Sequence, residues 1–333
     1  SWFGVSTHLD DNSPFIQNAF NTIPLGSILI FGPGRYDCKQ TITFPYRYEE
    51  PPKTNIGITI QGSTKLPYGS VNQTVFNYVG DDSDGLTPFF DFRCISNKGI
   101  QYFKGSIRNI LIRGTGPNGN VVGLLFHRCV GSTFDEISVV RCKCGIQINE
   151  YYYCCVFNKI KCSGCDYGLK TYNLGNYSSF NYCHFSGNNI GCAFNLSYDS
   201  IGTGINLNAC YFEDDNIAIQ TSQQRILNIH QCYFEHIHEY VIDIIDGTRY
   251  LPSQTISIQN TRLDFDCSKL TSNKAAIRQS INPNRTLNLI LRDNLIYNWY
   301  DVIPDYLVYV KTGDIVIQAE NNKMLWPSRN FPI

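Results

Sequence analysis

Charged residues and strong helix formers are scarce in this sequence of 333 residues. Only 17% of the residues are charged and the formal net charge is −1, so the chain lacks the electrostatic signature of nucleic-acid or membrane binding. No apolar run approaches the roughly 20 residues that a membrane helix needs. Alanine, leucine, glutamate and lysine are too few for a helical bundle, whereas 20 Phe and 22 Tyr indicate a β-rich globular chain.

Several familiar catalytic motifs are missing as well. The sequence contains no G-x-x-x-x-G-K-[ST], no H-E-x-x-H and no G-x-S-x-G, which argues against a P-loop, a zinc-protease helix and a hydrolase elbow. His236 and His238 form an H-x-H pair, but no third ligand is evident in the sequence. We therefore predict neither a metal nor a cofactor.

Cysteine is abundant, with 14 residues. Disulfide frameworks belong mainly to short secreted chains, and this chain is long. Zinc sites favour C-x2-C pairs, of which the segment 162–165 is one. Because free cysteine also behaves as a small buried hydrophobe, we expect mostly buried thiols.

An internal repeat is the strongest pattern in the sequence. The stretch Cys-Tyr-Phe-Glu occurs at 210–213 and again at 232–235. A wider pattern, apolar-x-x-(apolar or small)-x-apolar, begins at residues 107, 134, 157, 180, 207, 229, 258 and 291. A second apolar segment, often led by glycine, follows each of the first six. Short strands in a repeat of this length, with no helix between them, are typical of a β-solenoid, in which successive coils stack about 4.8 Å apart.

The beginning of the chain has a different pattern. Asp10, Asp11 and Asn12 predict a helix start, and a short amphipathic helix is expected over about 13–22, followed by a strand within 27–31. Such a helix can cap the open end of a solenoid, where strand edges would otherwise be exposed. We predict a cap over 1–50, a β-helix over 51–326 and a tail over 327–333.

This opening carries a family resemblance. The pattern DD-x4-(I/F)-Q-x-A-(F/I), then G-(S/T)-(I/V)-x-(F/I)-x-P-G-x-Y, is matched at Asp10, Asp11, Ile16, Gln17, Ala19, Phe20, Gly26, Pro33, Gly34 and Tyr36. It resembles the pectate-lyase-like parallel β-helix superfamily, and most of all bacteriophage tailspikes and capsular polysaccharide depolymerases. The resemblance implies an all-β, right-handed, single-stranded parallel β-helix with a short N-terminal capping helix. It also implies a homotrimer in the virion tail or outside the cell, with a bacterial surface polysaccharide as partner.

Acidic residues recur at one register of the repeat. The residue after the last apolar position is Ser163, Ser186, Glu213, Glu235 or Asp264, so stacking would place the acids in one column. Glycosidases use two carboxyl groups about 5 Å apart for retention, or about 6.5–9.5 Å apart for inversion. Glu213, Glu235 and Asp264 are therefore the candidate acid, base or nucleophile. The alternative is a structural role, in which each acid accepts backbone N–H bonds in its turn.

Further residues near these acids are candidates for substrate binding: Asp215, Asp243, Asp246, Arg225, Arg249, Arg262, His236, His238, Tyr211 and Tyr233. Arginine is suited to orienting an acidic sugar. We predict endo-glycosidic hydrolysis of a capsule or O-antigen by paired carboxylates. A lyase, in which a base abstracts the C5 proton of a uronic acid, and a non-catalytic glycan-binding spike stay open as alternatives.

Overall fold

A computed structural model describes most of the chain in two compact units, Ser1–Tyr172 (unit 1) and Asn173–Ile333 (unit 2). The described residues are 3–45, 55–63, 73–83, 85–93, 95–96, 99–100, 102–173, 175–196, 202–222, 224–245, 253–266, 269–270, 275–280, 286–297, 306–311 and 314–325. Each unit is built from parallel strands in stacked coils, and unit 1 also has one helix. The predicted all-β parallel β-helix is confirmed. The predicted boundaries at residues 50 and 326 lie outside the described residues and stay predictions.

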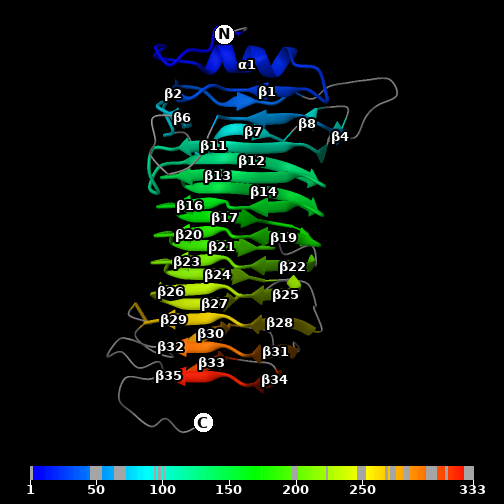
Figure 1. The fold of residues 1–333 in the computed structure, drawn as a ribbon, viewed down its shortest axis with the longest axis vertical. Helices are drawn as coiled ribbons and strands as arrows, with labels where there is room; N and C mark the ends of the chain where they lie inside the picture. The colour runs from blue at the N-terminus through cyan, green and yellow to red at the C-terminus, as the bar shows by residue number, and fades with distance from the viewer. Residues whose placement is uncertain are drawn as a thin grey trace. The chain divides into compact units, whose positions relative to one another are not determined.

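Unit 1 starts with helix α1 (Ser13–Thr22), which lies beside the first strands (Figure 1). One parallel sheet of the unit contains β1 (Ile28–Ile30), β2 (Gly34–Cys38), β5 (Thr59–Gln61), β6 (Thr74–Tyr78), β11 (Ser106–Arg113), β13 (Thr133–Val140), β15 (Val156–Asn158) and β16 (Lys161–Ser163). The other contains β3 (Ile42–Thr43), β4 (Asn55–Ile56), β7 (Thr87–Phe92), β10 (Tyr102–Phe103), β12 (Val121–Val130), β14 (Cys144–Tyr153) and β17 (Tyr167–Thr171). A short antiparallel pair is formed by β8 (Ile95–Ser96) and β9 (Gly99–Ile100).

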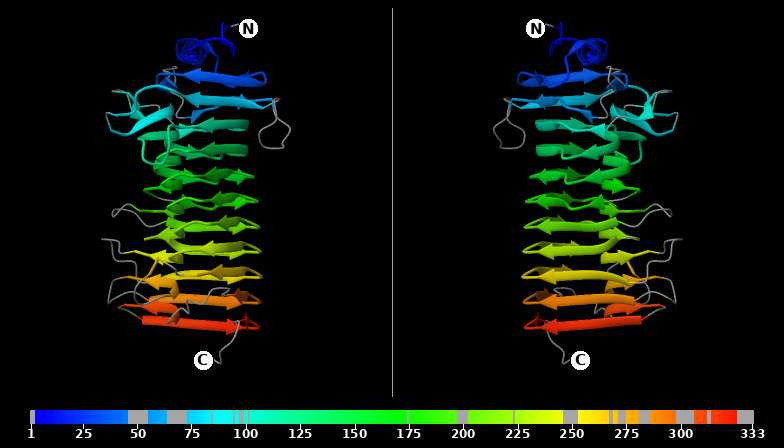
Figure 2. Two further views of the ribbon diagram at one scale, coloured as in Figure 1. Left: turned by 90° about the vertical axis from the view of Figure 1, so that its left-hand side faces the viewer. Right: turned by 90° about the vertical axis from the view of Figure 1, so that its right-hand side faces the viewer.

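Unit 2 repeats three strands per coil, and equivalent strands form three rows. Figure 2 shows the coils of this unit stacked on one another. The first strand row is β19 (Ser178–Asn181), β22 (Gly202–Asn208), β25 (Gln224–His230), β28 (Ser253–Gln259), β31 (Thr286–Arg292) and β34 (Asp314–Glu320), preceded by β18 (Gly175–Asn176). The second strand row is β20 (His184–Ser186), β23 (Tyr211–Glu213), β26 (Tyr233–Ile237), β29 (Arg262–Phe265), β32 (Leu295–Tyr297) and β35 (Lys323–Leu325). The third strand row is β21 (Ile190–Phe194), β24 (Ile217–Thr221), β27 (Tyr240–Ile244), β30 (Ala275–Gln279) and β33 (Tyr306–Val310).

The strand register confirms the repeat inferred from the sequence. In unit 1, Ile107 pairs with Phe134, which pairs with Phe157 on the next coil. In unit 2, the inward column of the second strand row runs Phe185, Phe212, Phe234, Leu263 and Ile296. Neighbouring phenylalanine rings of this column stack at 5.1 and 4.9 Å between centroids. Stacked apolar columns thus form the core of each unit.

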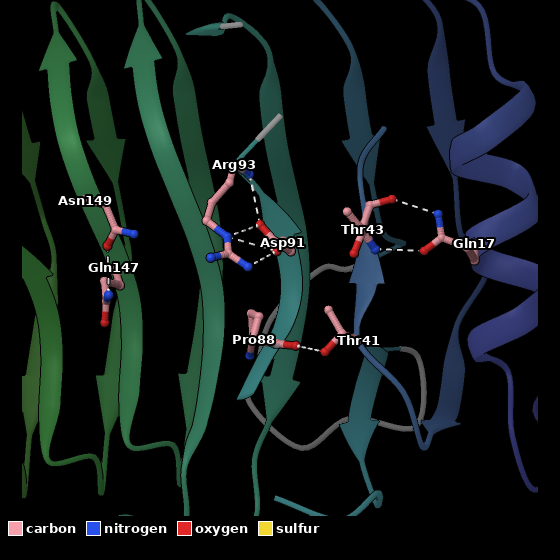
Figure 3. Close-up of polar contacts among 8 residues, drawn as sticks. All are labelled: Gln17, Thr41, Thr43, Pro88, Asp91, Arg93, Gln147 and Asn149. Atoms are coloured by element: carbon pink, nitrogen blue, oxygen red, sulfur yellow. Dashed lines mark hydrogen bonds and ion pairs between the residues drawn. The ribbon is translucent and has the colours of Figure 1, made fainter. Parts of the chain in front are cut away.

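The capping helix satisfies an exposed strand edge through one glutamine. Figure 3 shows Gln17 reaching from α1 to β3, where its Nε2 donates to Thr43 O and its Oε1 accepts from Thr43 N, both at 2.7 Å. The side-chain amide therefore replaces a missing neighbouring strand at this residue. The helix begins where the sequence predicts: Asn12 holds the N-cap position without a side-chain capping bond, and Asp11 accepts the Ser13 N–H.

The structure describes twelve of the 14 cysteines, all as free thiols, and every one except Cys154 is buried. The expectation of buried thiols is confirmed for these residues, while Cys94 and Cys267 lie outside the described part. Burial raises the pKa of Cys38 and of Cys155 to about 12. Such thiols stay protonated and unreactive at neutral pH.

Between the first and second strand rows, the chain of unit 2 turns sharply at one residue with positive φ, and the next side chain points inward. The positive-φ residues include Ala209 and Gln231, although glycine and asparagine adopt such backbone angles most readily. The inward side chains form a ladder of bonds between coils. Cys210 N–H donates to Cys232 Sγ (3.4 Å), and Cys232 N–H donates to Thr261 Oγ1 (3.2 Å). We call this column the bend ladder.

Asn294 continues the bend ladder and gives a stability test. Its Oδ1 accepts Thr261 N–H (3.0 Å) and its Nδ2 donates to Ile258 O (2.8 Å), both in buried surroundings. Asn294→Ala leaves the Thr261 N–H and the Ile258 carbonyl without these hydrogen-bond partners, so we expect a loss of about 2–5 kcal/mol in the free energy of unfolding. Urea denaturation measures it. Asn322→Ala is the matched control, because Asn322 is half-buried and water can replace its bonds. Equal losses in the two variants would contradict this account.

Candidate active site

The second strand row of unit 2 presents two columns of polar and aromatic side chains on its outer face, because side chains alternate along a strand. The second residue of each strand points into the core. The first residues form the aromatic column: His184, Tyr211, Tyr233 and Arg262. The third residues form the acid column: Ser186, Glu213, Glu235, Asp264 and Tyr297.

The predicted stacking of the acids holds for two of the three. Glu213 pairs in register with Ser186 on one side and with Glu235 on the other. A β-bulge follows, because the register between β26 and β29 shifts after Phe234 and Glu235 has no directly paired residue on β29. Asp264 still lies next in the column, but it is 1% exposed. The two glutamates are accessible, whereas the aspartate is buried beside them.

Each glutamate is held by a side chain from the aromatic column. Glu213 Oε2 lies 3.1 Å from His184 Nε2, and Glu235 Oε2 accepts the Tyr211 hydroxyl hydrogen bond. Burial, with the bond to Glu235, raises the pKa of Tyr211, so its hydroxyl stays a donor. Among the described residues, no backbone N–H donates to either carboxylate.

The aromatic column is a continuous stack. His184 stacks on Tyr211 at 4.7 Å, and Tyr211 stacks on Tyr233 at 5.0 Å with ring planes 3° apart. The Arg262 guanidinium then lies between the rings of Tyr233 and Tyr297, 4.7 and 4.6 Å from their centroids. Cation–π contacts on both faces hold this guanidinium in one orientation.

Asp264 has the most perturbed carboxyl group of the site. Burial raises its pKa from 3.8 to about 6, while the charges of Arg262 and His236 oppose that rise and Glu235 adds to it. Its Oδ2 lies 3.8 Å from Arg262 Nη2, and its buried Oδ1 has no hydrogen-bond partner within the described part of the chain. A buried carboxyl that keeps its proton to about pH 6 is typical of acid–base sites.

Two histidine–aspartate pairs border the acids. His236 Nδ1 lies 3.3 Å from Asp214 Oδ1, and His238 Nδ1 lies 3.3 Å from Asp266 Oδ2. The two histidines therefore contact different aspartates rather than a shared centre. No group of three or more potential metal ligands occurs among the residues that the structure describes.

The remaining predicted binding residues lie away from this face or outside the described residues. Asp215 is fully buried, and its Oδ1 accepts bonds from Asn188 N and Nδ2. Asp243 is in the third strand row, where its carboxylate pairs with Arg278 Nε at 2.8 Å. Arg225 is exposed in the first strand row. Asp246 and Arg249 fall in a segment that is not described.

Sequence reasoning missed His184 and Tyr297. His184 stands where Tyr211 and Tyr233 stand in the next two coils, and Tyr297 stands in the acid column. Both positions were readable from the repeat. An interpretation limited to carboxylates leaves out both residues. The contact between Arg262 and Tyr297 also depends on side-chain orientation, which the sequence does not give.

Comparisons with known proteins agree with this architecture. The ORF18 protein of Geobacillus virus E2 matches with a TM-score of 0.60 and 18% identity, over 98% of this chain and 60% of that one. The tailspike protein of Acinetobacter phage vB_ApiP_P1 matches with a TM-score of 0.59 and 15% identity, over 100% and 63%. The gp42 tailspike of Acinetobacter phage vb_AbaP_AS12 matches with a TM-score of 0.53 and 9% identity, over 97% and 61%. The chain shares the parallel β-helix fold of phage tailspikes.

These three proteins are longer than this chain, which spans about three fifths of their length. At such low identity the likeness concerns the fold. No protein-family model and no curated protein sequence matches the chain. Within the described residues, α1 is too short to cross a membrane and no other helix could do so.

Proposed function

We propose that this tailspike-like chain binds and cleaves a bacterial surface polysaccharide by endo-glycosidic hydrolysis, with Glu213 and Glu235 as the catalytic pair. The observation that carries the proposal is that both carboxylates lie on adjacent coils of an outer face and contact only side chains among the described residues. A purely structural acid would be expected to accept backbone bonds in its turn, as Asp215 does. A coil spacing of about 4.8 Å fits the carboxyl separation of about 5 Å in retaining glycosidases.

The neighbours of the two glutamates suggest their roles. Glu213 contacts His184, whose protonated form stabilises a carboxylate, so Glu213 is assigned as the nucleophile. Glu235 is assigned as the acid and base, because it lies next to Asp264, which keeps a proton up to about pH 6. Asp264 itself is too buried to touch a sugar and acts through Glu235.

The reaction then follows the retaining course. Protonated Glu235 gives its proton to the glycosidic oxygen while a Glu213 oxygen bonds to the anomeric carbon, and the bond to the leaving sugar breaks. Glu235, now a carboxylate, takes a proton from water. The hydroxide oxygen bonds to the anomeric carbon and releases Glu213. Tyr211 holds Glu235, and the ring edges and hydroxyls of the stacked aromatic column are the parts that a sugar can contact.

Products distinguish this proposal from its rivals. We expect that incubation with a panel of purified capsules and O-antigens gives fragments of whole repeating units, each with one added water by mass spectrometry. Fragments without that water, with new near-ultraviolet absorbance, would indicate that the reaction is elimination and not hydrolysis. Binding without any new reducing ends would identify a non-catalytic spike. The homotrimer and the location in a virion tail stay predictions from the resemblance.

A further inference from the structure

We propose a second glycan-binding site in unit 1, at Tyr102, Arg128 and Tyr151, that takes an acidic sugar residue such as a uronate. These three side chains come from β10, β12 and β14 of one sheet. Register places them on successive coils, because Phe103 pairs with Cys129 and Arg128 pairs with Tyr151. We call this group the Arg128 sandwich. None of its residues belongs to the site proposed for cleavage.

The guanidinium of Arg128 is fixed between two rings. Its central carbon lies 5.4 Å from the Tyr102 ring centroid and 5.1 Å from that of Tyr151. The Tyr153 ring stacks on Tyr151 at 5.8 Å and extends the aromatic surface. The three tyrosines are partly exposed, so the parts of the rings that Arg128 and the neighbouring ring do not cover are accessible to a sugar.

The ion pair with Glu150 leaves the two terminal nitrogens of Arg128 available to bind a ligand. Glu150 Oε2 accepts from Arg128 Nε, and Glu150 Oε1 lies 3.0 Å from His127 Nε2, so both oxygens of this carboxylate are occupied. No hydrogen-bond partner of Arg128 Nη1 or Nη2 occurs among the described residues. A guanidinium with its terminal donors free is suited to a two-point bond with a carboxylate.

A β-bulge in β14, opposite His127, supports a functional role for the Arg128 sandwich. Between Phe126 and Arg128 the register with β14 shifts by one residue, so Asn149 and Glu150 lie opposite His127 alone. Figure 3 shows the first bulge residue, Asn149, held by Gln147 Nε2 at 2.8 Å. Bulges often re-aim side chains at functional sites. Here the extra residue places the Glu150 carboxylate on the Nε edge of Arg128.

The candidate active site contains a similar arrangement of an arginine between two tyrosine rings. Arg262 also lies between two tyrosine rings, has a carboxylate at one edge and stands beside a bulge. A polysaccharide repeats its sugar residues, so a second site for one acidic residue would hold the polymer without cleaving it. The proposal concerns binding in unit 1, so it does not require that the acid column cleaves anything.

Binding of methyl β-D-glucuronide tests the site, with methyl β-D-glucoside as the neutral control. Saturation-transfer NMR on the full chain is expected to detect the glucuronide and not the glucoside. Arg128→Gln should reduce the affinity of the unit 1 site about tenfold or more, because a charge-assisted pair is lost. Arg262→Gln measures the contribution of the similar arrangement around Arg262 in unit 2, and the double variant should remove the signal.

Matched controls separate binding from folding. Arg35→Gln removes an exposed arginine whose one ion pair among the described residues is with Asp37, and it should leave the signal unchanged. Tyr102→Leu provides a second disruption of the sandwich if Arg128→Gln lowers the melting temperature. Equal binding of the glucoside, no binding of the glucuronide, or a signal that depends on Arg262 alone would each overturn the proposal. Cleavage assays play no part in these outcomes.

Discussion

Glu235→Gln is expected to lower depolymerisation by about 100- to 10,000-fold, the range for losing a general acid or base. Glu213→Gln should cost at least as much, because it removes the nucleophile. Glutamine keeps the size and the hydrogen-bonding capacity of the side chain but can neither give up a proton nor attack an anomeric carbon. Both residues lie on the outer face rather than in the core, so the melting temperature should change little. Initial rates of reducing-end release from a cleaved polysaccharide measure the effect.

A matched acid elsewhere on unit 2 provides the control. Glu320 pairs with Arg292 in the first strand row, with 61% of its side chain exposed. Glu320→Gln should keep the full rate. The double variant of Glu213 and Glu235 should be about as slow as the slower single one, because the two groups act in one reaction. Wild-type rates in both single variants would move catalysis away from the acid column.

Asp264→Asn is expected to make the protein more stable at pH 8 by about 3 kcal/mol while lowering its activity. Burial raises the pKa of Asp264 from 3.8 to about 6 in the folded chain. The folded state therefore binds this proton more tightly than the unfolded state does. The stability that Asp264 contributes is complete below about pH 4 and is lost as the pH rises through about 6. Asparagine cannot ionise, so the variant avoids that loss.

Urea denaturation at pH 4 and pH 8 measures this effect. The variant and the wild type should differ little at pH 4 and most at pH 8. Asp214→Asn is the comparison, because Asp214 is exposed in its pair with His236 and its replacement should not alter stability in this way. A variant that is no more stable than the wild type at pH 8 would show that ionised Asp264 does not destabilise the folded state. A gain in stability with full activity would instead remove Asp264 from the mechanism.

The repeat made much of the fold predictable. Apolar residues at fixed offsets, such as Phe212 and Phe234, could share a core only if successive coils stacked in register, and the structure pairs them so. The same periodicity placed Glu213 beside Glu235. It did not show that Asp264 would be buried and out of direct register with Glu235, because the bulge after Phe234 adds a residue without changing the apolar pattern.

The sequence by itself determined the coil, its inward columns and the helix over 13–22, because these depend on short-range periodicity that any stacked coil must satisfy. Only the tertiary structure decided which polar residues meet. It joined His184 to Glu213 and set Arg262 between Tyr233 and Tyr297. It also sent Asp215 into the interior and Asp243 to another strand row. These outcomes depend on bulges, bends and rotamers, whose energies differ by a few kcal/mol and leave no periodic trace in a single sequence.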